Sequence, residues 1–104
     1  MTLGAWLRER TPQPPPRLAA RIEETLGVRC GQDAADATEL CVSAANELLT
    51  ELLARASAGR ESALDLLTVD ALVTYAFEAA SVDPSSLGAR ATDAMSRLAF
   101  AGRN

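Results

Sequence analysis

The sequence predicts an all-α protein: an antiparallel helical bundle of about four main helices with a short proline-tethered N-terminal helix. Three observations lead to this fold class. Apolar residues recur at helical spacing, helix start and stop residues separate the apolar segments, and no stretch has the sustained alternation of a strand. We expect residues 1–15 to form the short helix and its proline-rich arm, and residues 16–104 to form the bundle domain, with main helices over 16–27, 33–58, 61–81 and 84–100.

The N-terminal segment predicts a short amphipathic helix over residues 2–10, because Leu3, Trp6 and Leu7 share one side at helical spacing. The sequence "TPQPPP" ends that helix, and its prolines favour a stiff, extended arm. We expect Trp6 to fold back and cover the open side of the bundle. The alternatives are an exposed anchor for a groove on another protein, or exchange between two subunits across the proline arm.

The first main helix is expected to begin near Pro16, since proline is tolerated in a first turn, and to end before Gly27. The second should begin at Asp33, a good N-cap. Further acids follow at Asp36 and Glu39, where the helix dipole favours negative charge. A broad apolar stripe then continues to about residue 58. Gly59 offers the stop, so a tight hairpin to the next helix is expected.

The third main helix contains "ALDLLTVDALVTYAFEAA", which is apolar on most of its circumference. Its one polar wedge comprises Glu61, Asp65, Thr68 and the ring edge of Tyr75. A helix of this kind is normally surrounded by protein, so it predicts the centre of the bundle or the seam of a dimer. Asp70 and Glu78 fall among apolar positions and are predicted to be buried carboxylates. We expect each to pair with an arginine of the 16–27 helix or to lie at the bundle rim; the alternative is a polar contact in a pocket or interface.

The last main helix is predicted from Asp83 as N-cap and Pro84 at the first helical position. Its expected inward face consists of Leu87, Ala91, Ala94, Met95 and Leu98.

Composition excludes several classes of function. The chain has 104 residues, is 48% hydrophobic and carries a net charge of −4. Residues 1–31 hold five Arg against three Glu, whereas residues 32–104 hold five Arg against eleven acids. The larger, acidic part would repel phosphate, so we expect no nucleic-acid partner. No apolar run approaches the length of a membrane span, and a cytoplasmic protein with reduced Cys30 and Cys41 is expected.

Catalytic and metal-binding signatures are lacking. The chain has no His to activate a thiol or hydroxyl. Without His, and with only two Cys, a structural zinc site is effectively excluded. The acids at 33, 36 and 39 rotate around their helix rather than converging. We therefore expect a protein that is not an enzyme and uses no cofactor or metal.

The remaining prediction is a non-catalytic protein-interaction module, self-associating as a homodimer, or docking on a partner protein, through the helix over 61–81. Its candidate interface residues are Trp6, Leu64, Leu67, Ala71 and Tyr75. One alternative is a bundle that binds an apolar small molecule in an internal pocket, with Tyr75 and Asp70 as orienting groups. Another is a regulatory or accessory subunit of an enzyme encoded elsewhere.

Overall fold

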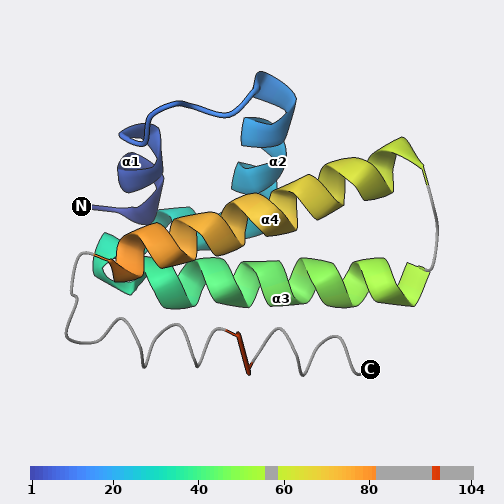
Figure 1. Ribbon diagram of the computed structural model, residues 1–104. Coiled ribbons are helices and arrows are strands. Elements are labelled where there is room, and N and C mark those ends of the chain that lie inside the picture. Colours follow the sequence, from blue (N-terminus) through green and yellow to red (C-terminus); the bar gives the residue numbers. More distant parts are fainter. Residues whose placement is uncertain (56–58, 82–94, 97–104) are drawn as a thin grey trace.

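The computed structural model describes residues 1–55, 59–81 and 95–96. Within this part of the chain, four helices pack together: α1 (Leu3–Arg8), α2 (Pro16–Leu26), α3 (Ala37–Arg55) and α4 (Arg60–Ala80) (Figure 1). The all-helical prediction is confirmed for these residues. Apart from Met95 and Ser96, the helix expected over 84–100 lies outside the described residues. No described helix is both long and apolar enough to cross a membrane.

The two long helices, α3 and α4, lie side by side and form the largest contact in the described fold (Figure 1). Both helices bury small residues, Ala44 and Ala45 on α3 and Ala76 on α4, and small side chains allow a close approach between helices. The Thr38 hydroxyl in the first turn of α3 donates to the carbonyl of Ala76 at 3.0 Å. This bond fixes the longitudinal position of one helix on the other.

Helix α2 has the predicted boundaries. Pro16 occupies its first turn, and Gly27 follows its last residue with a φ of 56°, a value that glycine adopts without the steric cost of a side chain. Ile22 and Leu26, four residues apart on one face of the helix, are buried. The sequence signals at both ends therefore suffice to define this helix.

The helix predicted over 33–58 begins later than expected, and residues 56–58 lie outside the described part of the chain. Residues Ala34–Asp36 form a 3₁₀ turn, and α3 begins only at Ala37. The cause is local: the Asp33 carboxylate accepts a hydrogen bond from the Ala35 amide at 2.9 Å, and the Asp36 amide donates to the Asp33 carbonyl at 3.0 Å. The second bond has the three-residue spacing of a 3₁₀ turn, so the chain tightens before α3 starts.

The N-terminal helix α1 joins the same core as the long helices. Its Leu3 and Leu7 are buried in one cluster with Ile22 and Leu26 of α2 and Leu72 of α4. Backbone hydrogen bonds hold its start in place: the Leu3 amide donates to the Gln32 carbonyl at 2.8 Å, and the Ala34 amide to the Met1 carbonyl at 2.9 Å. Helix α1 thus packs directly against the bundle.

Candidate interaction surface

Near its start, α4 points polar side chains inward and leucines outward. Asp65 is 3% exposed and Thr68 is fully buried, whereas Leu66 and Leu67 are each 56% exposed. In most surface helices the apolar stripe faces the core and the polar residues face water. The first half of α4 reverses this order, and the reversal requires a partner for the buried carboxylate.

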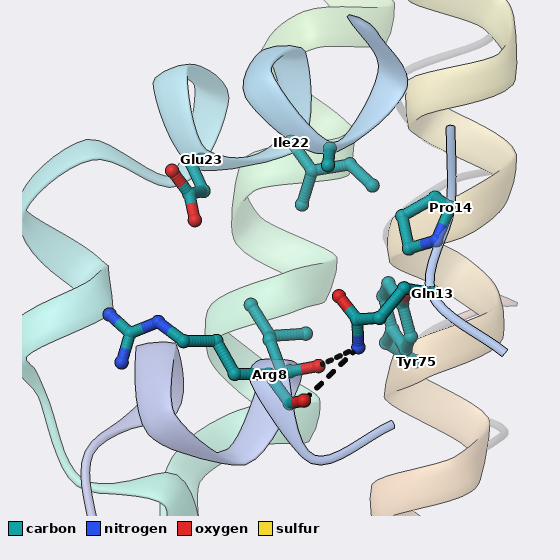
Figure 2. A pocket seen from close by; sticks show the side chains of 8 residues that line it. Arg8, Gln13, Pro14, Ile22, Glu23 and Tyr75 are labelled. Atoms are coloured by element: carbon teal, nitrogen blue, oxygen red, sulfur yellow. Dashed lines mark hydrogen bonds between the residues drawn. The ribbon is translucent and has the colours of Figure 1, made fainter. Parts of the chain in front are cut away.

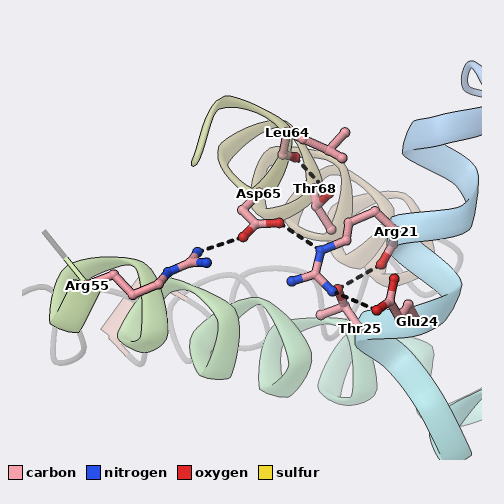
Figure 3. Close-up of polar contacts among 7 residues, drawn as sticks. All are labelled: Arg21, Glu24, Thr25, Arg55, Leu64, Asp65 and Thr68. Atoms are coloured by element: carbon pink, nitrogen blue, oxygen red, sulfur yellow. Dashed lines mark hydrogen bonds and ion pairs between the residues drawn. The ribbon is translucent and has the colours of Figure 1, made fainter. Parts of the chain in front are cut away.

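Asp65 is held by two arginines from two other helices (Figure 3). Arg21 of α2 donates through Nε to Oδ1 at 2.7 Å, and Arg55 of α3 donates through Nη2 to Oδ2 at 2.7 Å. Both carboxylate oxygens therefore accept charge-assisted hydrogen bonds, the strongest class available to a side chain. The bond from Arg21 lowers the pKa of the Asp65 carboxyl, against the opposing effect of burial, and the bond from Arg55 lowers it further.

The buried hydroxyl beside this carboxylate is satisfied within its own helix. Thr68 donates through Oγ1 to the Leu64 carbonyl at 2.8 Å. On α2, Thr25 donates in the same way to the Arg21 carbonyl at 2.7 Å, and Arg21 also approaches Glu24 to 3.6 Å (Figure 3). The polar cluster around Asp65 is thus closed and has the character of a structural clamp joining α2, α3 and α4.

The prediction that Asp70 and Glu78 are buried is wrong: both are exposed. Asp65 and Leu72 lie seven residues apart and therefore share the inward face of α4, whereas Asp70 and Glu78 project from its outer side. An arginine of α2 does bind a carboxylate of α4, but the carboxylate is Asp65. The signal available in the sequence was the polar wedge containing Asp65 and Thr68, which faces the other helices rather than water.

The five predicted interface residues fall into two groups. Leu64, Leu67 and Ala71 follow one another along the outer side of α4, where Leu67 is exposed and the other two are half-buried. Trp6 and Tyr75 instead contact each other, with ring centroids 6.2 Å apart and ring planes at 77°. That edge-to-face geometry is favourable for aromatic pairs. Trp6 therefore folds back onto its own chain, as we expected from the sequence.

Arg10 completes the docking of α1. Its guanidinium carbon lies 4.4 Å from the centre of the Trp6 ring, within the range of a cation–π contact. The Gln13 side-chain amide donates to the carbonyls of Leu7 at 3.0 Å and Arg8 at 3.3 Å (Figure 2). It also donates to the carbonyl of Arg10. The Leu7 and Arg8 carbonyls lie in the last turn of α1, and the Leu7 carbonyl also accepts from the Arg10 amide at 3.1 Å. Gln13 of the proline arm thus adds side-chain hydrogen bonds at the end of the helix that precedes it.

A small cavity lies where α1, the proline arm, α2 and α4 meet (Figure 2). Its volume is about 30 Å³, and its lining includes Leu7, Gln13, Ile22 and Tyr75. That space holds about two water molecules, whereas sites for drug-sized ligands measure about 300 Å³ or more. The cavity is therefore much smaller than the internal pocket that the apolar-ligand hypothesis needs.

The two thiols are free and poorly placed for chemistry. Cys30 is half-buried and Cys41 is buried. Burial raises the pKa of the Cys41 thiol to about 12, and burial is also the main cause that raises the pKa of Cys30. A raised pKa leaves less thiolate at neutral pH and so lowers nucleophilic reactivity. Across the described residues, no three His, Cys, Asp or Glu side chains come together in a group that could hold a metal ion.

No protein-family model matches this chain, and no similar chain was found among curated proteins or solved structures. The outer side of α4 is accordingly the feature from which a function is inferred.

Proposed function

We propose that this chain is a non-catalytic helical interaction module that self-associates through the outer side of α4. The observation that carries the proposal is the reversal at the start of that helix, where Leu67 is 56% exposed although Asp65, two residues before it, is buried. Burying a leucine side chain fully contributes about 1.5–3 kcal/mol. A second molecule seated on this side would recover part of that free energy for each leucine that it covers.

The ion pairs of Asp65 explain why Leu66 and Leu67 of α4 face outward. Rotating the helix far enough to bury Leu67 would withdraw Asp65 from both Arg21 and Arg55. Removing one partner of a buried ion pair is strongly unfavourable because it leaves an uncompensated charge. The outward position of Leu67 is thus supported by contacts on the opposite side of the same helix.

We also propose that the described helices form an antiparallel bundle. Two contacts support the antiparallel arrangement of α3 and α4. Thr38 near the start of α3 bonds to Ala76 near the end of α4, and Arg55 at the end of α3 bonds to Asp65 near the start of α4.

Native mass spectrometry over a concentration series tests the proposal. A self-associating module gives a bare dimer whose fraction rises with concentration, because assembly follows mass action. A bare monomer at every concentration contradicts self-association. A subunit that carries additional small-molecule mass favours the pocket instead. The accessory-subunit alternative predicts a monomer that forms a defined complex with a different protein.

A further inference from the structure

Building on the proposed self-association, we infer that two copies pair their α4 helices antiparallel, with the twofold axis between Leu67 and Ala71. The inference begins with spacing. Positions 60, 64, 67, 71, 74 and 78 follow each other in alternating steps of four and three residues. This is the heptad spacing of a helix–helix seam. Over slightly less than three heptads, residues with this spacing stay on one side of a helix. We call these six positions the α4 seam.

Five of the six α4 seam positions are at least partly accessible in the described structure. Leu67, Thr74 and Glu78 are exposed, and Leu64 and Ala71 are half-buried. The residues that α4 buries, including Asp65, Leu72 and Ala76, lie on its other side. The exposed seam positions therefore lie away from the residues through which α4 packs against the rest of the described fold.

Side-chain sizes favour antiparallel pairing. The spacing of the seam positions is the same whether it is counted from residue 60 or from residue 78. In an antiparallel pair, each seam position therefore lies opposite a seam position of the partner. Leu67 then faces the partner's Ala71, and Leu64 faces the partner's Thr74. Large side chains meet small ones, which is how well-packed layers interdigitate. A parallel partner would set Leu against Leu and Ala against Ala, and the alanine layer would leave empty space, which is unfavourable.

Charge favours the same orientation. Glu78 lies in the last turn of α4 and is exposed. In a parallel pair it would face the partner's Glu78, and like charges repel. In the antiparallel pair it faces the first turn of the partner's α4, where the helix dipole is positive. The residue at that position in the sequence is Arg60, whose charge is opposite to that of Glu78.

Cysteine cross-linking tests the register. In a Cys30→Ser background, which keeps only the buried Cys41, three variants are compared: Leu64→Cys, Thr74→Cys, and both together. The antiparallel register brings position 64 near the partner's position 74, within the reach of a disulfide. Mild oxidation should then give covalent dimers from the double variant and from a mixture of the two single variants, but not from either single variant alone.

The other outcomes separate failure of the register from failure of the proposed function. Covalent dimers from each single variant alone would overturn the antiparallel register in favour of a parallel one. A dimer by sedimentation that cross-links at none of these positions would overturn the α4 seam as the interface. A monomer by sedimentation would overturn self-association itself, and the register with it.

A charge exchange provides a second, independent test. Glu78→Arg should weaken dimerisation about tenfold, equivalent to about 1.4 kcal/mol. Adding Arg60→Glu to that variant should restore dimerisation only if positions 60 and 78 face each other across the interface. If Glu78→Arg weakens the dimer and adding Arg60→Glu does not restore it, the antiparallel register is contradicted.

Discussion

Asp65 and Leu67 lie two residues apart on α4, yet Asp65 is 3% exposed and Leu67 is 56% exposed. Both oxygens of the Asp65 carboxylate accept 2.7 Å hydrogen bonds, one from Arg21 of α2 and one from Arg55 of α3 (Figure 3). The two arginines approach from different helices and so fix the rotation of α4 about its axis. The ion pairs on one side of the helix thereby determine which leucines remain on the other.

Replacing Asp65 with Asn should lower the free energy of unfolding by about 2 kcal/mol, because hydrogen bonds to a charged group contribute about 1.5–3 kcal/mol. The loss should stay below the 3–5 kcal/mol reported for fully buried pairs, since both arginine side chains are partly exposed and can return to water. Urea unfolding measures the change. Asp70→Asn, an exposed change on the same helix, is the matched control and should be close to wild type.

The ion pairs of Asp65 with Arg21 and Arg55 should also make the free energy of unfolding depend on pH in acid. The hydrogen bonds to Asp65 lower the pKa of its folded-state carboxyl below the ordinary 3.8. The contribution of a group with a lowered pKa is fully present above the unfolded-state value and is lost as pH falls through the folded-state value. The difference in unfolding free energy between wild type and Asp65→Asn should therefore shrink below pH 3.8. A difference that stays constant down to strong acid would contradict this assignment.

Trp6→Ala should release α1 from the bundle. The substitution removes the edge contact with Tyr75 and the ring under Arg10. A fully buried aromatic residue replaced by Ala costs about 3–5 kcal/mol, so about 2 kcal/mol is expected for a half-buried one. Trypsin should cleave after Arg8 and Arg10 earlier in the variant than in wild type. Trp6→Phe keeps an aromatic ring and should remain closer to wild type; equal cleavage of all three proteins would show that Trp6 does not hold α1.

Cys41 should react with thiol reagents only when the protein unfolds. It is buried, and that burial raises its pKa to about 12, so little thiolate is present at neutral pH. Labelling in native buffer should modify at most Cys30, whereas labelling in denaturant should modify both thiols. Rapid native labelling of Cys41, located by peptide mass mapping, would contradict the described packing of α3.

The sequence predicted well what depends on neighbouring residues. Pro16 and Gly27 define the ends of α2 through their own backbone preferences. Periodicity also grouped Asp65 with Thr68 in one wedge of α4, but it does not say which side of a helix faces inward. That choice depends on Arg21, which lies 44 residues earlier in the chain.

The errors at Asp70 and Glu78 have the same origin. Both acids fall among apolar positions, and the prediction placed the whole circumference of α4 inside the protein. In the described structure α2 and α3 cover one side, and the outer side retains these acids together with Leu67. Long-range packing, which no local pattern contains, decided the burial of each carboxylate.

Sedimentation velocity of wild type, Leu67→Asp and Leu66→Asp at matched concentrations tests the central claim most directly. The two leucines are equally exposed in the subunit, so both substitutions should leave its folding intact, as circular dichroism can verify. Only Leu67 belongs to the α4 seam. We predict that Leu67→Asp is monomeric where wild type and Leu66→Asp are dimeric. A folded Leu67→Asp that dimerises as wild type does would contradict the claim.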